Sequence, residues 1–215
     1  MTVNVTVVDY GVGNLLSVTR ALAHVGAAPV LSSDPAVILA SEFLVLPGVG
    51  AFGAAMMELE RRGLTGALRE RGRCGRPFLG ICLGAQLLLD GSDEFGSHDG
   101  LGLISGRVQA VPSTGGDGRT HRIPHIGWAD LAEPAPGRWQ GTIFQDTRPG
   151  TSVYFVHSFH AMPTDPAHLL AVVDYDGIPV TAAIGHGAVT GCQFHPEKSG
   201  EAGLRMLHRF AGLGD

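Results

Sequence analysis

The stretch FLGICLGAQ, residues 78–86, decides the fold, because it passes within one turn from a strand-like to a helical pattern. Pro77 to Ile81 is an apolar run that predicts a strand, and Leu83 to Asp90 predicts a helix that follows at once. Glycines at positions 80 and 84 remove side chains that would clash in so sharp a turn. This arrangement is a nucleophile elbow, which projects one reactive side chain from a strand-to-helix junction.

Cys82 occupies the centre of that elbow. The partial positive charge at a helix N-terminus favours the thiolate, which is the nucleophilic form of cysteine. A buried structural cysteine on a turn would give the same spacing, so the rest of the chain must decide between the two interpretations.

The segment QFHPEK, residues 193–198, offers a base and a group to orient it. A residue before proline favours an extended backbone, and residues i and i+2 of an extended segment face the same side, roughly 6.5 Å apart. Glu197 is therefore expected to reach the ring of His195 and hold it while it exchanges a proton with Cys82. A surface H-x-E on a loop is the ordinary alternative.

A glycine-rich junction, PGVGAF at residues 47–52, allows backbone N–H groups to approach a ligand, as an oxyanion hole requires. A phosphate loop is disfavoured because no Gly-Lys-Ser/Thr follows. The run Gly11-Val12-Gly13 is not a dinucleotide motif, since Leu16 stands at the third glycine position and no suitable acidic residue follows about 20 positions later. The histidine pairs lack accompanying cysteines or carboxylates, so we expect no cofactor and no metal.

Short apolar runs alternate with helical patterns through the first hundred residues, which predicts an α/β fold with a mostly parallel central sheet flanked by helices. The later half is β-rich and closes with a helix. We expect one domain over residues 1–215, with 113–121 as a mobile surface loop. Further expected strands are 3–9, 29–31, 43–46, 107–111, 151–155, 169–175, 178–184 and 189–193, and further expected helices are 15–25, 51–62, 64–71 and 200–211.

Composition narrows the class of protein and its compartment. Hydrophobic residues make up 44% and charged residues 16%, a globular balance, and the net charge of −5 gives no basic surface for nucleic acid. No apolar run approaches the roughly 20 residues of a membrane helix, and no export signal opens the chain. Three cysteines suit a reducing compartment better than a disulfide framework. We expect a cytoplasmic protein that meets neither membrane nor nucleic acid.

The motifs PGVG (47–50), GICLGAQ (80–86) and FHPE (194–197) together resemble class I glutamine amidotransferases, in the same order and over nearly the whole chain. Within that class, DYGVGN (9–14), PHIGW (124–128), VYFVHSF (153–159) and QFHPEKS (193–199) resemble the glutaminase subunits of imidazole glycerol phosphate synthase. Ala85 stands where that family commonly has methionine, and Ala129 where asparagine is usual. The first departure changes the packing under the elbow but no catalytic atom, and the second removes a polar side chain near the expected interface.

The resemblance implies a Cys-His-Glu triad that hydrolyses L-glutamine through a γ-glutamyl thioester. It implies a heterodimer in which ammonia passes to a cyclase subunit that makes imidazole glycerol phosphate and aminoimidazole carboxamide ribonucleotide. The implied residues are Cys82, His195 and Glu197 for catalysis; Leu83, Val49 and Gly50 for the oxyanion hole; Gly48, Gln86, Glu94, Ser158 and Phe159 for glutamine; and Asn14, Trp128 and Lys198 for the partner interface.

Two other functions fit the same residues less well. A free-standing thiol hydrolase, such as a γ-glutamyl hydrolase, would keep fold and triad but would not need the segments 1–14 and 124–128. A non-catalytic binding subunit would have no reason to keep Cys82, His195 and Glu197 together. Ordinary structural roles compete for the interface residues: a helix N-cap for Asn14, a core aromatic for Trp128 and a solvated charge for Lys198.

Overall fold

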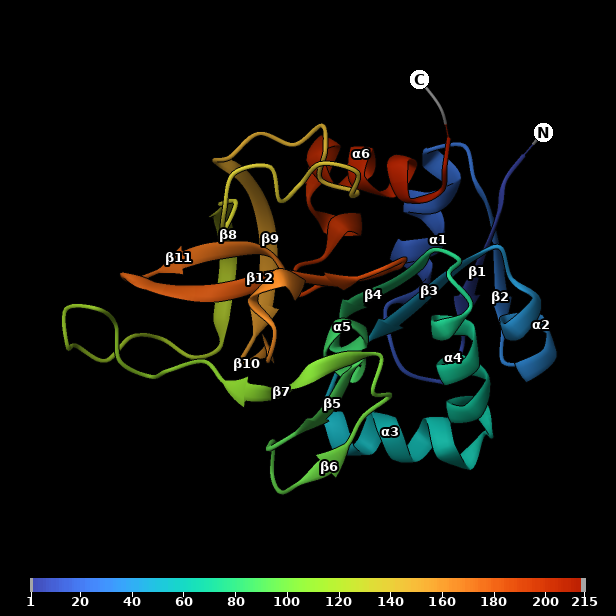
Figure 1. The fold of residues 1–215 in the computed structure, drawn as a ribbon, viewed down its shortest axis with the longest axis horizontal. Coiled ribbons are helices and arrows are strands. Elements are labelled where there is room, and N and C mark those ends of the chain that lie inside the picture. Colours follow the sequence, from blue (N-terminus) through green and yellow to red (C-terminus); the bar gives the residue numbers. More distant parts are fainter. Residues whose placement is uncertain (1, 214–215) are drawn as a thin grey trace.

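A seven-stranded sheet lies at the centre of the computed structural model, which describes residues 2–213 (Figure 1). Its order is β11 (Leu169–Tyr175), β12 (Ile178–His186), β13 (Val189–Cys192), β4 (Phe78–Cys82), β3 (Phe43–Gly48), β1 (Asn4–Val8) and β2 (Ala28–Ser32). The five strands from β13 to β2 are mutually parallel; β12 pairs antiparallel with β13, and β11 pairs antiparallel with β12. The predicted mostly parallel sheet is confirmed.

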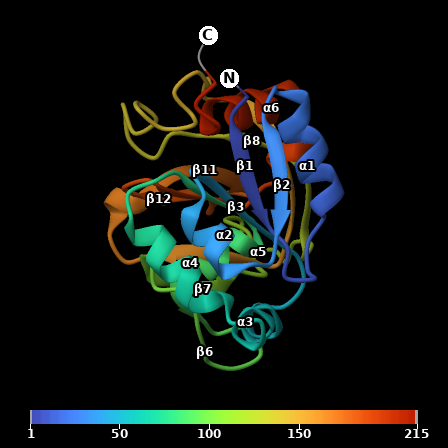
Figure 2. The ribbon, with the colours of Figure 1, turned by 90° about the vertical axis from the view of Figure 1, so that its right-hand side faces the viewer.

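Helices cover both faces of this sheet. On one face lie α1 (Leu15–His24) and α6 (Gly200–Phe210); on the other lie α2 (Pro35–Ala40), α3 (Phe52–Arg61), α4 (Leu64–Arg73) and the short α5 (Leu83–Leu87). Figure 2 shows α1 and α6 together toward the top and α3 and α4 below. Each face has its own apolar core, one including Leu22, Leu207 and Phe210, the other Ile38, Phe52 and Leu68. The sheet is therefore buried on both sides, as parallel strands require.

Two smaller sheets and two single turns complete the chain. One sheet has the order β10 (Phe159–Pro163), β7 (Ile104–Ala110), β5 (Leu89–Ser92), β6 (His98–Asp99), and β8 (His125–Leu131) pairs with β9 (Thr151–His157). The 3-10 turns are η1 (Pro166–His168) and η2 (Pro196–Lys198). The loop 113–121 carries one isolated bridge, between Thr114 and Thr120. No helix in the part of the chain that the structure describes is long and apolar enough to cross a membrane.

The expected helices and strands are confirmed with one error, which also hid β5, and four further omissions. The helix expected over 83–90 ends at Leu87 and gives way to β5. The reason is that residues 101–104 donate backbone hydrogen bonds to the carbonyls of Leu87, Leu88 and Leu89, which draws this segment out of the helix. The omitted elements are α2, β6, β8 and β10. Of these, α2 had a local signal, since Asp34 caps it through the Ala36 N–H (2.8 Å) and Pro35 follows at the first helical position.

Candidate active site

The elbow places Cys82 at the carboxyl end of β4, in the middle of the sheet. Cys82 has φ 55° and ψ −113°, a strained conformation for a residue with a side chain. The glycines around it have no room for a Cβ: at Gly80 it would lie 2.6 Å from the Gly84 carbonyl oxygen, and at Gly84 it would overlap the Leu46 carbonyl. The sequence therefore holds the thiol at a fixed position above the sheet edge.

His195 and Glu197 form a buried pair beside Cys82. Their Nδ1 and Oε1 atoms lie 2.8 Å apart, and the two side chains are 4% and 1% exposed. Burial lowers the pKa of His195, but the neighbouring Cys82 and Glu197 outweigh burial and raise that pKa to about 9. The imidazolium form of His195 is thus favoured. The predicted pair is present, but its expected geometry was wrong: Glu197 lies in the turn η2, not in an extended segment.

Ser199 fixes this pair from behind, a role that the sequence analysis did not assign. Its Oγ donates to the His195 carbonyl (2.6 Å) and accepts from the Tyr154 N–H (3.0 Å), while the His195 N–H donates to the Tyr154 carbonyl (3.0 Å). These bonds tie the turn η2 to β9 and so orient the base.

A cavity of about 380 Å³ opens above the elbow. It is lined by nine of the expected residues, Val49, Gly50, Cys82, Leu83, Gln86, Glu94, Ser158, Phe159 and His195, together with Phe95, Val156 and His157. Gly48, expected to bind glutamine, does not line it. A Cβ at Gly48 would lie 2.7 Å from the Tyr10 hydroxyl and 3.0 Å from the Gly84 nitrogen, so Gly48 is packed behind the cavity wall instead.

Two polar side chains of the cavity are already held by the protein. Gln86 donates through Nε2 to the Phe159 carbonyl (2.9 Å) and to Gln193 Oε1 (2.9 Å). Glu94 accepts the Phe52 N–H through Oε2 (2.6 Å) and so caps α3, which has no cap from its own N-terminal residue. These bonds orient both side chains, and they leave the one side-chain oxygen of Gln86 and the second carboxylate oxygen of Glu94 for a ligand.

His157 and Gln193 belong to the site although the sequence analysis did not single them out. Burial lowers the pKa of His157 to about 3, so its ring is neutral, and its Nδ1 lies 2.9 Å from the Phe159 carbonyl. Gln193 Nε2 lies 3.9 Å from Cys82 Sγ. The signal for Gln193 was its spacing of two residues from His195, which places both on one side of an extended segment.

The three expected interface residues differ in exposure and in the contacts they make. Trp128 is 58% exposed on β8, which rules out the core alternative, and packs edge-on against Tyr154 with ring centroids 5.9 Å apart. Lys198 is exposed, and its Nζ lies 5.9 Å from the centre of the same tyrosine ring. Asn14 does cap α1, accepting the Ser17 N–H at 3.3 Å. Its capping role and an interface role are compatible.

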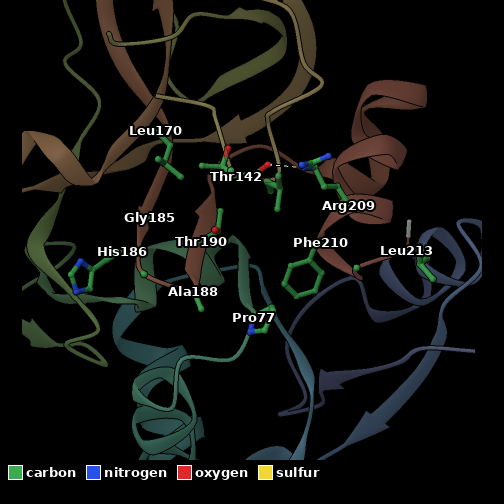
Figure 3. A pocket seen from close by; sticks show the side chains of 14 residues that line it. Pro77, Thr142, Leu170, Gly185, His186, Ala188, Thr190, Arg209, Phe210 and Leu213 are labelled. Atoms are coloured by element: carbon green, nitrogen blue, oxygen red, sulfur yellow. Dashed lines mark hydrogen bonds between the residues drawn. The ribbon is translucent and has the colours of Figure 1, made fainter. Parts of the chain in front are cut away.

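A second, larger cavity of about 560 Å³ lies at the opposite ends of β4 and β13, near Pro77, Ala188 and Thr190 (Figure 3). Its one strongly charged side chain, Arg209, is already paired with Asp146 (2.7 Å) and the Thr142 carbonyl (3.0 Å). Among the described residues that line it there is no cysteine and no pairing of a histidine with a carboxylate. Over residues 2–213 no cluster of three or more metal-binding side chains occurs in either place.

Comparison with known proteins agrees with the geometry. Residues 6–212 match the sequence model of the family described as glutamine amidotransferase class-I. The chain is 50% identical over 208 residues to imidazole glycerol phosphate synthase subunit HisH 1 of Legionella pneumophila (strain Lens), covering 96% of this chain and 98% of that one. Identity to the HisH subunit of Streptococcus sanguinis is 47% over 205 residues, covering 95% and 93%.

Solved structures agree on the fold alone. The structure of PurLQS from Thermotoga maritima superposes with a TM-score of 0.73 at 19% identity, covering 98% of each chain. The sequence comparisons are more specific than this structural likeness, because they combine nearly full coverage with identities of 47–50%. The chain belongs to the class I glutamine amidotransferases and, within them, to the family of imidazole glycerol phosphate synthase HisH subunits.

Proposed function

We propose that this chain is the glutaminase subunit of imidazole glycerol phosphate synthase, hydrolysing L-glutamine to glutamate and ammonia. The observation that carries the proposal is a thiol and an imidazole on one cavity, with the Glu197 carboxylate paired to that imidazole from behind, in a chain 43–50% identical to such subunits. The match of one family sequence model to residues 6–212 supports treating the chain as one domain.

The reaction begins with the Cys82 thiolate and the His195 imidazolium. The sulfur attacks the side-chain amide carbon of glutamine, and the C=O electron pair moves onto oxygen. His195 then gives its proton to the departing nitrogen, so that ammonia leaves and a γ-glutamyl thioester remains. Next His195 takes a proton from water, the hydroxide attacks the thioester, and glutamate leaves as the thiolate returns. Glu197 keeps the ring in the tautomer that both steps need.

Backbone N–H groups of Leu83 and of the Val49–Gly50 turn are our candidates for holding the oxyanion. Leu83 is the first residue of α5, where N–H groups lack partners within the helix, and the turn lines the opposite side of the cavity. The free oxygens of Gln86 and Glu94 suit the ammonium group of an amino acid. The Phe159 carbonyl already accepts two hydrogen bonds. We therefore assign glutamine contacts in that segment to its N–H groups and to Ser158.

A cyclase partner would cover the mouth of this cavity. Exposed apolar side chains gather on the neighbouring strand and turns, with Ile126 and Trp128 on one face of β8 and Val49 on the oxyanion turn. Such a surface is typical of a protein interface. Ammonia would pass to the cyclase, which forms imidazole glycerol phosphate and aminoimidazole carboxamide ribonucleotide. We place the pair in the cytoplasm, in keeping with three free cysteines.

The test is glutamate release from glutamine by the purified chain, first alone and then with a cognate cyclase subunit and its nucleotide ligand. Weak activity that rises strongly in the mixture would support a coupled glutaminase. Strong activity that ignores the partner would indicate a free-standing thiol hydrolase and would contradict the proposal.

A further inference from the structure

We propose that Gln193 is a further catalytic residue, whose side-chain N–H stabilises the Cys82 thiolate. This inference rests on the proposed function for the reaction it serves, but its geometry is independent of the partner subunit. Gln193 Nε2 lies 3.9 Å from Cys82 Sγ, and Gln193 is 2% exposed.

A chain of hydrogen bonds determines which end of the Gln193 amide faces the sulfur. The Phe159 carbonyl can only accept, so Gln86 presents its NH2 group there (2.9 Å). The same NH2 group donates to Gln193 Oε1 (2.9 Å), which fixes the Gln193 oxygen on the Gln86 side. The NH2 group of Gln193 must then point to Cys82. The Phe159 carbonyl therefore determines, through the side-chain amides of Gln86 and Gln193, that a hydrogen-bond donor faces the sulfur of Cys82.

The anchor of this chain is itself held in place. The Phe159 carbonyl also lies 2.9 Å from His157 Nδ1, and His157 Nε2 lies 3.2 Å from His125 Nδ1. Burial lowers the pKa of His157 to about 3, so its ring is neutral and Nδ1 can donate to the carbonyl. Gln86 and His157 are 5% and 6% exposed. In such surroundings a hydrogen bond to a charge is stronger than in water.

The other polar neighbour of the sulfur acts in the opposite sense. Cys82 Sγ lies 4.0 Å from the Val156 carbonyl, an acceptor that suits the thiol but not the thiolate. The Gln193 N–H favours the thiolate instead, in addition to the N-terminus of α5 and the imidazolium of His195. Loss of this donor should therefore slow every reaction of the sulfur.

Alkylation of Cys82 by iodoacetamide, followed by mass spectrometry from pH 5 to 10, tests this on the isolated chain. Gln193→Glu keeps the shape but replaces the donor by a carboxylate. We expect the alkylation rate at pH 7 to fall about tenfold and its pH midpoint to move upward. Exposed Cys74 in the same molecules is the internal reference, and exposed Gln109→Glu is the matched variant. With the partner present, kcat for glutamine should fall by a similar factor.

A second variant tests the relay even if Gln193→Glu fails to fold. Gln86→Glu removes the NH2 group that holds the Gln193 oxygen, so the Gln193 amide should turn and present its carbonyl to the sulfur. Slower alkylation of Cys82 is again expected. Unchanged alkylation in the variants that fold would overturn the proposal. A parent protein without glutaminase activity, but with the expected alkylation pattern, would contradict only the proposed function.

Discussion

Strands β4 and β13 open onto different cavities at their two ends, and the smaller one holds the reactive groups. The cavity at the carboxyl end has a volume of about 380 Å³ and is lined by Cys82 and His195. The cavity at the other end has a volume of about 560 Å³ and is lined by Thr190 and Arg209 (Figure 3). Buried polar atoms without a partner occur at the smaller cavity, at His195 Nε2 and on its partner Glu197, and at none of the residues that line the larger one in the described chain.

Between these two cavities, unpaired polar atoms and not empty volume accompany the expected catalytic groups; the other unpaired atoms of the described chain, at Tyr10, Thr65, His121 and His168, belong to neither lining. Folding normally pairs buried polar groups, and the partly exposed Arg209 beside the larger cavity is paired as well. Groups left unpaired are available to a substrate. The following variants test whether the difference between the two cavities is functional.

The largest expected effect is that of Cys82→Ala. It removes the sulfur that we propose as the nucleophile, so glutamate release with the partner present should fall at least about 1,000-fold. Binding of the partner should be unchanged, because no interface side chain is altered. Cys74→Ser, at an exposed cysteine away from both cavities, is the control. Activity within tenfold of the parent would mean that Cys82 is not the nucleophile.

Glu197→Gln should have the next largest effect. The amide cannot stabilise the imidazolium of His195, and kcat should fall about 100- to 10,000-fold. Glu197 helps to raise the pKa of His195 to about 9. Without that carboxylate the alkaline limb of the pH–activity profile should therefore move to lower pH. The matched change, Asp146→Asn, removes the carboxylate paired with Arg209 beside the larger cavity. Equal losses in the two variants would remove the distinction between the cavities.

Replacing one glycine near each cavity by alanine compares the two cavities by steric means. At Gly48 a Cβ would meet the Gly84 nitrogen at 3.0 Å, and that backbone cannot move without moving the elbow. We expect Gly48→Ala to lower kcat at least about tenfold. At Gly185, on the larger cavity, a Cβ would meet the flexible end of Leu170 (2.6 Å). Gly185→Ala should leave kcat unchanged, and kinetic assays of both variants check this.

How far the sequence predicted the fold depended on the range of the interactions. The strands of the parallel sheet and most helices have local apolar patterns, and Leu169–Tyr175 was predicted to the residue. The helix expected over 83–90 was too long because its last carbonyls bond to residues 101–104, which no local pattern reveals. The strand β8 was missed for a similar reason: its alternation of buried and exposed residues is imposed by pairing with β9.

The site followed the same rule. The triad could be predicted because its members lie in short motifs, and its pairing was right although Glu197 reaches His195 through a 3-10 turn. The roles of other residues depend on tertiary contacts, which short motifs do not reveal. Glu94 caps α3 from 42 positions away, and Gly48 is packed behind the cavity. Gln193 is oriented by the amide of Gln86 and His157 by the imidazole of His125, partners that are distant in sequence.

Acid should destabilise the protein through the smaller cavity. The pKa of His157 is lowered to about 3 by burial, whereas an unfolded histidine has a pKa near 6.5. Between these values the unfolded chain binds more protons, so this contribution to the free energy of unfolding is lost as pH falls, by up to about 1.4 kcal/mol per unit. Urea titrations from pH 7 to 4 should show a shallower loss in His157→Gln. His186→Gln, on the larger cavity, controls for loss of a histidine.

The smallest effect is expected at Tyr10, whose hydroxyl is fully buried behind the smaller cavity and has no hydrogen-bond partner in the structure. An unpartnered hydroxyl costs about 1–3 kcal/mol on burial, so Tyr10→Phe should raise the free energy of unfolding by about 1 kcal/mol in urea titrations.

Tyr175→Phe gives the contrast, because that hydroxyl donates to the Arg122 carbonyl and its loss should lower stability. Equal destabilisation by both changes would mean that the Tyr10 hydroxyl has a partner in solution. If Tyr10→Phe gains stability and loses glutaminase activity, the unpaired hydroxyl behind Gly48 serves the reaction. If it gains stability and keeps its activity, unpaired polar atoms mark the site only where they can reach the cavity, as those of His195 do.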